Sequence, residues 1–473
     1  MVIAPDSSSN DYEVHAELAA KGIDVLVIDH HEADKVSEHA CVINNQLCDY
    51  PTKSLSGVGM VYKFCSYIDE LLNVDFADQF LDLVALGMVA DMMDLRDYET
   101  KHLITLGLNQ IRNPYFKGMV AKQEYQLKGE LTPFGVAFYI APYVNATIRM
   151  GTQDEKLMLF ESMLDYRGYE LVPSTKRGCK GQQETRVEQA CRNCTNIKNR
   201  QTKARDAALE TIEHIIEEKN LLDNKILAIK LDSFEADKNL TGLIANQLMA
   251  KYQRPVLLLN KVIDYEIEVS ELDGTVVNKV PIISWEGSGR GYDKSKFDNL
   301  REFLKESGLV MYAEGHANAL GVGIYDTFFE NFINFSNQQL AEFDFTPCYK
   351  VDFVFNGADF RGSDIIELAE LKPIWGQGVE EPLIAVEDIK INAENVVLMS
   401  PDKSPTLKIT LPNGTSLIKF KSSKEEFEKF NSQFGCITIN VVGKCERNTW
   451  NGIVKPQILV EDYEIVGEQK YYF

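Results

Sequence analysis

The stretch VLVIDHHEAD at residues 25–34 runs from four apolar residues directly into an aspartate and two adjacent histidines. Because the apolar run does not alternate with polar residues, it predicts a strand covered on both faces of a parallel sheet. Ligands of such sheets bind just beyond the carboxyl ends of the strands. Asp29, His30 and His31 are therefore expected where carboxylate and imidazole groups could meet a metal. A polar loop that binds nothing explains this stretch equally well.

The first 165 residues alternate short apolar runs with helical patterns, which predicts an α/β domain with a parallel sheet and crossover helices. The opening run MVIAP leads into Asp6, and a helical pattern covers residues 11–22. Further helical patterns cover residues 56–72 and 76–90.

A basic segment at residues 166–222 follows this domain. Apolar residues at helical spacing predict one long helix over 184–219, and its exposed charge favours a connector between domains over a core element. The net charge of the chain is −22, which disfavours a general nucleic-acid-binding surface. The local excess of Lys and Arg at 176–205 indicates either a solvated helix face, which we favour on this stretch alone, or a phosphate track that includes Lys198, Arg200 and Lys203.

Residues 223–345 form a second α/β pattern, with strands over 224–232 and 254–260 and a helix over 239–252. The glycine-rich WEGSGRGY is expected to form a turn, and AEGHANALGVGI ends this unit. Beyond residue 346 strands alternate with turns, including a hairpin with Asn413 and Gly414 at its tip. About five or six short strands in this length predict a small barrel or sandwich.

Several protein classes are disfavoured by composition. The chain has no apolar run near the ~20 residues that span a bilayer, and its first residues lack the pattern of a signal peptide. The chain has 9 irregularly spaced cysteines, which is typical of a reducing cytoplasm rather than of a disulfide framework. Cys191 and Cys194 form a close pair, but only Cys179 lies near enough to help bind zinc, so free thiols are expected.

Two acids join the histidine pair as candidate ligands. Asp6 and Asp91 each follow an apolar run, and we expect both at strand ends, in one crevice with His30 if the strands are adjacent. Ser56 and Gly57 begin a helix whose free backbone N–H groups could approach a phosphate. Carboxylates with imidazole suit manganese or a similar divalent ion, and two such ions suit phosphodiester hydrolysis. The acids could instead cap helices, Asp6 especially.

These motifs together resemble a known family. VIDHHEAD is similar to the signature of the DHH phosphoesterase superfamily, and PDSSSND, SGVGMVYKF, LGMVADMMDL and YVNATIRM resemble its other elements in order. GSGR at 287–290 and EGHANALG at 314–321 resemble the DHHA1 domain, although Glu314 replaces a usual glycine. ELKPIWGQGVEEP and KPQILVEDYE look like the barrel of RecJ-type single-strand DNA exonucleases.

The resemblance implies a fold and a domain order over nearly the whole chain. An α/β parallel-sheet DHH domain at 1–165, lacking part of its N-terminus, would be joined by the basic helical segment at 166–222 to a smaller α/β DHHA1 domain at 223–345. An all-β OB-like barrel that binds nucleic acid would follow at 346–473, with Trp450 either stacking on bases or lying in its core.

The resemblance also implies roles for individual residues. Asp6, His30 and Asp91 would bind Mn²⁺ or Mg²⁺, with His31 as a ligand or a contact of the scissile phosphate and Asp29 orienting a histidine. Ser56 and Gly57 would approach substrate phosphate. Asn145 and Arg149 would contact the sugar–phosphate backbone of the substrate. Arg290 and His316 would bind the phosphate of its terminal nucleotide.

The function implied is metal-dependent 5′-to-3′ exonuclease activity on single-stranded DNA in repair, recombination or replication. Its partners would be single-stranded DNA and a single-strand-binding or other replication or repair protein, without a membrane, in the cytoplasm of a bacterial or phage-infected bacterial cell. Two alternatives stay open: a DHH–DHHA1 phosphatase or nanoRNase on short oligonucleotides, and a catalytically degenerate single-strand-binding replication factor.

One motif of the family does not match. The family's Asp-x-Asp motif usually precedes the motif that contains Asp6, and only five residues precede Asp6 here. We therefore expect an incomplete two-metal site, weak or absent activity of these 473 residues alone, and an Asp-x-Asp segment encoded upstream.

Overall fold

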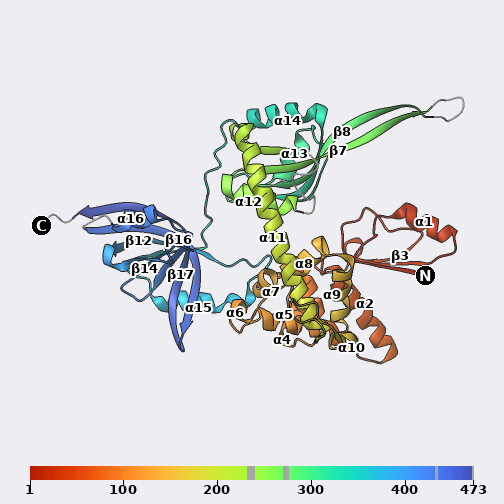
Figure 1. The fold of residues 1–473 in the computed structure, drawn as a ribbon, viewed down its shortest axis with the longest axis horizontal. Helices are drawn as coiled ribbons and strands as arrows, with labels where there is room; N and C mark the ends of the chain where they lie inside the picture. The colour runs from red at the N-terminus through yellow and green to blue at the C-terminus, as the bar shows by residue number, and fades with distance from the viewer. Residues whose placement is uncertain (232–239, 270–275, 432–434, 471–473) are drawn as a thin grey trace. The chain divides into compact units, whose positions relative to one another are not determined.

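A computed structural model describes residues 1–231, 240–269, 276–431 and 435–470 of the chain (Figure 1). The chain divides into two compact units. Unit 1 comprises Met1–Thr147, Thr152–Cys194 and Lys350–Phe473, and unit 2 comprises Ile148–Gly151 and Thr195–Tyr349. Among the described residues no helix is both long and apolar enough to cross a membrane.

The N-terminal part of unit 1 contains the predicted parallel sheet. Strands β1 (Val2–Pro5), β2 (Val25–Asp29) and β3 (Cys41–Asn44) lie in the order β1-β2-β3, and α1 (Tyr12–Ala20) links the first two. The short 3-10 helix η1 (Asn45–Leu47) follows β3. β2 is the central strand, and Val25, Val27 and Ile28 are buried, as their unbroken apolar run predicts.

The expected α/β alternation stops after β3, because the chain from residue 57 to residue 168 is helical. Its core is built around α3 and α5, with Met88, Ile104, Tyr115, Phe116 and Met119 fully buried. The helices are α2 (Gly57–Leu72), η2 (Ala77–Phe80), α3 (Leu81–Ala90), α4 (Tyr98–Asn109), α5 (Pro114–Lys122), α6 (Glu124–Leu127), α7 (Pro133–Tyr139), α8 (Ala141–Met150), α9 (Gln153–Met163) and α10 (Asp165–Gly168).

The long helix predicted over 184–219 is confirmed as α11 (Arg186–Glu218), preceded by the hairpin β4 (Leu171–Pro173) and β5 (Gln183–Thr185). It is not only a connector, since it carries core residues of both units. Cys191 and Cys194 are buried in unit 1, whereas Ile212 and Ile216 are buried in unit 2. Both cysteines are free, as expected, and burial raises the pKa of Cys191 to about 12.

Part of the basic stretch is neutralised within unit 1. Arg186 pairs with Glu161 and Glu170, and Arg192 pairs with Glu184. The hydrogen bonds from Arg192 lower the pKa of Glu184 to about 2. These two arginines therefore anchor the start of α11 and are not available as phosphate contacts.

Unit 2 contains a mixed sheet in the order β6-β7-β8-β10-β9. Its elements are η3 (Leu221–Asp223), β6 (Leu227–Leu231), α12 (Thr241–Tyr252), β7 (Val256–Val269), β8 (Val276–Arg290), α13 (Leu300–Glu306), β9 (Tyr312–His316), β10 (Ala319–Tyr325) and α14 (Asp326–Gln339). β6 pairs with β7 in parallel, and the other pairs are antiparallel.

The predicted glycine-rich turn is wrong, because GSGR lies inside β8 and pairs with β7 and β10. The glycines serve close approach instead of a turn. A Cβ atom on Gly287 would lie 2.0 Å from the carbonyl oxygen of Leu258. Glu314, likewise, is a strand residue of β9 paired with Gly321.

The C-terminal part of unit 1 is a seven-stranded sheet in the order β11-β12-β16-β17-β15-β14-β13, which exceeds the number of strands expected. It also contains helices, so it is not purely β. The elements are β11 (Phe353–Asn356), α15 (Gly362–Glu370), η4 (Lys372–Ile374), β12 (Leu383–Asn392), η5 (Ala393–Asn395), β13 (Val396–Met399), β14 (Thr406–Thr410), β15 (Ser416–Phe420), α16 (Lys424–Asn431), β16 (Gly435–Trp450) and β17 (Ile453–Lys470).

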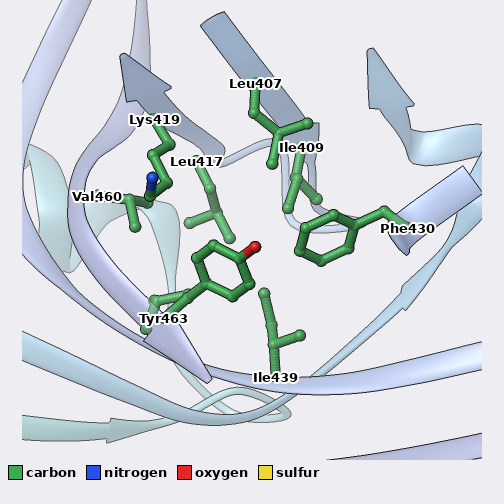
Figure 2. Close-up of a pocket in the computed structure, with 9 residues that line it drawn as sticks. Leu407, Ile409, Leu417, Lys419, Phe430, Ile439, Val460 and Tyr463 are labelled. Atoms are coloured by element: carbon green, nitrogen blue, oxygen red, sulfur yellow. The ribbon is translucent and has the colours of Figure 1, made fainter. Parts of the chain in front are cut away.

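The predicted hairpin is formed by β14 and β15, and Gly414 in its turn has a φ of 84°. Figure 2 shows a small apolar pocket in this domain, with Phe430, Ile439 and Tyr463 directed into it. These aromatic rings belong to the core and so do not provide a base-stacking surface. The side chain of Trp450 lies outside the described residues.

We expect Gly287→Ala to lower the free energy of unfolding by about 1–3 kcal/mol, because the added methyl group overlaps the backbone of β7. Gly321→Ala is the matched control, since its Cβ atom would meet its nearest neighbour at 3.9 Å. Urea unfolding of both variants tests the difference. Equal stabilities would show that β7 and β8 do not require glycine here.

Glu184→Gln should destabilise the chain by about 1–3 kcal/mol at pH 7, because the pKa of Glu184 is about 2 in the folded chain, below its ordinary value of 4.5. This contribution is complete above pH 4.5 and is lost as the pH falls towards 2. Urea unfolding at several pH values should therefore show the variant approaching wild type in acid. Glu217→Gln, at an exposed position of α11, controls for the loss of one charge. A pH-independent deficit would contradict the ion pair.

Candidate metal and phosphate site

Asp6 occupies a constrained position immediately after β1. Its backbone N–H donates to the carbonyl of Ile28 at 2.8 Å, so the ladder with β2 extends to this residue. Its φ is 59°, in the left-handed region, which non-glycine residues adopt mainly where the surrounding structure forces them. A Cβ atom on Gly57 would lie 2.1 Å from Asp6 Oδ1. Gly57 is therefore the residue that lets this carboxylate rest against the start of α2.

His30 joins the two expected acids. Its Nε2 atom lies 3.2 Å from Asp6 Oδ1 and 3.3 Å from Asp91 Oδ2. The imidazole is 11% exposed, whereas the two carboxylates are 61% and 50% exposed. Asp6, His30 and Asp91 thus converge from three elements, as the sequence predicts.

The predicted location of Asp91 at a strand end is wrong, because it caps the C-terminal end of helix α3. The apolar run before it is buried on all sides by neighbouring helices, so it does not show the face pattern of a surface helix. A carboxylate at a helix C-terminus is repelled by the carbonyl end of the helix dipole. Its position next to His30 and Asp6 therefore favours a bound positive charge.

Asp29 and His31 form a second pair beside this cluster. His31 Nδ1 lies 2.7 Å from Asp29 Oδ1, which also accepts from the backbone N–H of His30 at 2.8 Å. Burial alone would raise the pKa of Asp29, but hydrogen bonds from Ser9, His31 and His30 outweigh it and hold the pKa at about 2. The hydrogen bond to Asp29 raises the pKa of His31, and its ring remains 60% exposed.

The ligand atoms have the spacing that a divalent ion requires. Neighbouring ligands of an octahedral ion at about 2.0–2.1 Å lie about 3 Å apart. The distances from His30 Nε2 to the two carboxylates match this spacing. In addition, one ligand atom each from Asp6, Asp29, His30 and His31 lies within 4.8 Å of the others. Mixed oxygen and nitrogen donors suit Mn²⁺ or Mg²⁺ better than a sulfur-preferring metal.

Sequence reasoning missed the residues that support the histidine loop. The backbone N–H of Ser9 donates to Asp29 Oδ2 at 3.2 Å. Asn44 Nδ2 donates to Ser9 Oγ at 2.8 Å and to the carbonyl of His31 at 2.9 Å. Asn44 is opposite Asp29 in the β2–β3 register. Only strand pairing reveals this neighbour, because the two residues are far apart in the sequence.

Ser56 and Gly57 begin helix α2 beside Asp6, as predicted. Ser56 is buried, and its hydroxyl oxygen has no hydrogen-bond partner among the described residues. Free backbone N–H groups at a helix start attract anions. The start of α2 therefore offers donors next to the carboxylate cluster.

A separate group of cations lies in unit 2. Burial, followed by the charge of Arg149, lowers the pKa of Arg290. Burial, followed by the charges of Arg205 and Arg149, lowers the pKa of Lys198. A bound anion would relieve this mutual repulsion. Arg149, Lys198 and Arg290 are therefore candidate phosphate contacts. The sequence predicted them separately, with Arg149 on the backbone of the DNA strand, Lys198 on the basic stretch and Arg290 on the terminal phosphate.

Strand register places His316 in line with Arg290. Ala319 of β10 pairs with Arg290 of β8 on one side and with His316 of β9 on the other. Residues paired in this way direct their side chains to the same face of a sheet. The sequence did not predict two neighbours of Arg290, Gly242 and Ser288. A Cβ atom on Gly242 would lie 2.5 Å from the guanidinium of Arg290. Ser288 is hydrogen-bonded to Thr241.

Asn145 is another substrate contact that the sequence predicts. It lies half-buried on α8 in unit 1, one turn before the exposed Arg149. The ion pairs that join Asp6, His30 and Asp91 do not include Asn145. Its role as a substrate contact therefore rests on the motif alone.

Comparison with known proteins places these motifs in a family. Residues 1–88 match the DHH family, N-terminal domain, and residues 351–462 match the RecJ OB domain. The putative SPbeta prophage-derived single-strand DNA-specific exonuclease YorK of Bacillus subtilis is 37% identical over 475 residues, which cover 98% of this chain and 78% of that protein.

More distant relatives share the same arrangement. The single-stranded-DNA-specific exonuclease RecJ of Bacillus subtilis is 26% identical over 466 residues, covering 95% of this chain and 52% of RecJ. The crystal structure of RecJ from Thermus thermophilus in complex with Mn²⁺ matches with a TM-score of 0.68 at 18% identity, covering 98% of this chain and 61% of that one. The chain thus spans only about half to two thirds of these RecJ proteins, whose fold it shares. On the extent and identity of the match to YorK, this chain belongs to the RecJ-like family of DHH exonucleases.

Proposed function

We propose that this protein is a metal-dependent exonuclease that hydrolyses single-stranded DNA from its 5′ end. The observation that carries the proposal is that carboxylate oxygens of Asp6 and Asp91 both lie within 3.3 Å of His30 Nε2. Asp6 also lies against the start of helix α2. Carboxylate–imidazole clusters bind divalent ions, and adjacent helix N–H groups bind phosphate. Phosphodiester hydrolysis needs both.

In the proposed reaction the cluster binds Mn²⁺ or Mg²⁺. The bound ion would activate water and stabilise the charge that develops on the leaving oxygen. Asp6, His30 and Asp91 act as its ligands. Asp29 fixes the orientation of His31 through Nδ1 and leaves Nε2 directed away for a ligand or the scissile phosphate. The N–H groups at Ser56 and Gly57 donate to phosphate oxygens.

The cations of unit 2 are proposed to hold the terminal nucleotide. Arg290 offers a planar guanidinium for bidentate binding of a phosphate, and Arg149 and Lys198 add charge beside it. His316 lies on the same face of the sheet and would contact the same end of the strand. Asn145 is proposed to contact the sugar–phosphate backbone of the DNA strand.

The polarity of the reaction and its macromolecular setting are also part of the proposal. Binding of the 5′-terminal phosphate would give 5′-to-3′ degradation, in repair, recombination or replication in the cytoplasm of a bacterial or phage-infected bacterial cell. The C-terminal domain would bind the single strand, and a single-strand-binding protein is the proposed protein partner.

Two other functions use the same residues. A phosphatase or nanoRNase would release product only from very short oligonucleotides, whereas an exonuclease degrades long strands. A degenerate single-strand-binding factor would bind without turnover. Manganese-dependent release of mononucleotides from a long single strand, abolished by a chelator, supports the exonuclease and excludes both alternatives.

Replacing His30 with alanine should lower manganese-dependent hydrolysis by about 10³-fold, because the loss of a metal ligand removes several kcal/mol of transition-state stabilisation. Direct Mn²⁺ titration should show a parallel loss of affinity. His39→Ala is the matched control, since His39 is exposed and lies outside the cluster. Unchanged Mn²⁺ affinity in a folded His30→Ala variant would refute the site.

Changing Lys198, Arg200 and Lys203 to Glu should weaken single-strand binding and flatten its salt dependence. Each lost phosphate contact should reduce the log–log slope by about 0.7. The control reverses Lys21, Lys101 and Lys117, which are exposed in unit 1, and changes the net charge equally. If both triple variants show the same slope, these residues belong to a solvated helix face.

A further inference from the structure

A tight turn in the C-terminal domain is built from residues 376–379, here called the 376–379 turn. The N–H of Gly376 donates to the carbonyl of Val379 at 2.9 Å, and the N–H of Val379 donates back at 3.1 Å. Gly378 has a φ of 76°, which a residue with a side chain adopts only under strain. Trp375, just before the turn, is buried.

The 376–379 turn contacts the segment that follows the helix α3. The N–H of Leu95 donates to the carbonyl of Gln377 at 2.8 Å. A Cβ atom on Gly378 would lie 2.0 Å from Asp94 Oδ1, and one on Gly376 would lie 2.4 Å from Leu95 Cδ1. Both glycines are therefore required by the close approach of the turn to Asp94 and Leu95.

The same segment begins with Asp91, three residues before Asp94. Asp91, the first residue of this segment, is fixed because its backbone N–H donates to the carbonyl of Gly87 at 2.9 Å. Its far end is fixed by the turn and by Ser54 Oγ, which accepts from Asp94 N–H at 2.6 Å. Between these points Met92 has a φ of 59°. The conformation that directs Asp91 towards His30 is thus held from both ends.

We propose that the 376–379 turn is a positioning element for Asp91, so that the C-terminal domain helps to complete the metal site as well as to bind the nucleic acid. The inference rests on the proposed function only in taking Asp91 as a metal ligand. The carboxylate of Asp91 is half exposed and lies at the unfavourable end of a helix dipole. Without a fixed backbone it would turn towards solvent.

Ion pairs between the same two parts of unit 1 are weaker candidates for this role. Lys128 pairs with Glu446 at 2.9 Å, and Arg447 pairs with Glu130 at 3.4 Å. Ion pairs with an exposed cation contribute little to stability and are screened by salt. They also do not contact the Asp91 segment, whereas the turn bonds directly to Leu95.

The test compares Gly378→Ala with Gly414→Ala in the full chain. Both glycines have left-handed φ and lie in the C-terminal domain, but a Cβ atom on Gly414 would meet nothing within 4 Å. Mn²⁺ titration followed by electron paramagnetic resonance should show about tenfold weaker binding in Gly378→Ala alone, the size of effect typical of residues that orient ligands. Single-strand binding in metal-free buffer should be equal in the two variants.

A rescue variant separates positioning from general damage. Adding Asp94→Ala to Gly378→Ala removes the carboxylate that the new methyl group would overlap, and Mn²⁺ affinity should return to within about threefold of Asp94→Ala alone. If Gly378→Ala fails to fold, Gly376→Ala, whose Cβ atom would lie 2.4 Å from the flexible end of Leu95, takes its place in the comparison with Gly414→Ala. Equal Mn²⁺ affinities of Gly378→Ala and Gly414→Ala would overturn the inference.

Hydrogen exchange keeps this test independent of the metal site. Backbone amides of residues 91–95 should exchange faster in Gly378→Ala than in Gly414→Ala, because the bond from Leu95 to Gln377 is weakened. If the wild-type chain binds no Mn²⁺ but this difference is present, the proposed function fails while the positioning contact stands. Equal exchange in both variants overturns the positioning role.

Discussion

The contact of His30 Nε2 with the carboxylates of Asp6 and Asp91 is the interaction on which the site depends. Two carboxylates held this close repel each other unless a positive charge lies between them. A divalent ion bound at this point would provide that charge. The parallel pairing of β1 with β2 and the end of α3 have to meet at one point to bring the three groups together, so the surrounding fold serves this contact.

Backbone strain also occurs at this point. Asp6 and Met92 both have left-handed φ, and each lies beside a residue of the cluster or belongs to it. Glycines supply the space that these conformations require, Gly57 against Asp6 and Gly378 against Asp94. Such strain persists only where the surrounding structure holds it. The N-terminal sheet, the helical part and the C-terminal domain all contribute to holding it, so the site depends on tertiary contacts from widely separated segments.

Charge is distributed unevenly in a chain whose net charge is −22. Arg186 and Arg192 are neutralised by glutamates and stabilise the start of α11. Burial, and after it like charges that include Arg149, instead lower the pKa of both Lys198 and Arg290, and a bound anion would relieve this repulsion. The local pairing of each cation, rather than the net charge, thus separates the arginines that stabilise the fold from the candidate phosphate contacts.

Local pattern was sufficient for the elements whose burial is simple. The apolar run of β2 identified a central strand and the histidines at its end, and helical spacing identified α11. Family motifs then identified Asp6, His30 and Asp91 as one group, which the structure brings together. In each case, the deciding information lies within a short window, because period and motif are properties of neighbouring residues.

Contacts between distant segments decided the rest. The glycines of GSGR predicted a turn, but Gly287 is a strand residue because β7 approaches too closely for a side chain. Asp91 ends a helix, in agreement with the helical pattern over 76–90. The expectation of a strand end was wrong because the apolar run of α3 is buried on all sides, as a buried strand would be. Asn44 has no sequence signal, and the motif that contains the 376–379 turn indicated only the barrel, because the contacts of both depend on partners brought near by folding. The sequence by itself determined which groups are candidates for binding a metal, and the tertiary structure decided which neighbours hold them in place, because a short window encodes the chemistry of a side chain but not its distant neighbours.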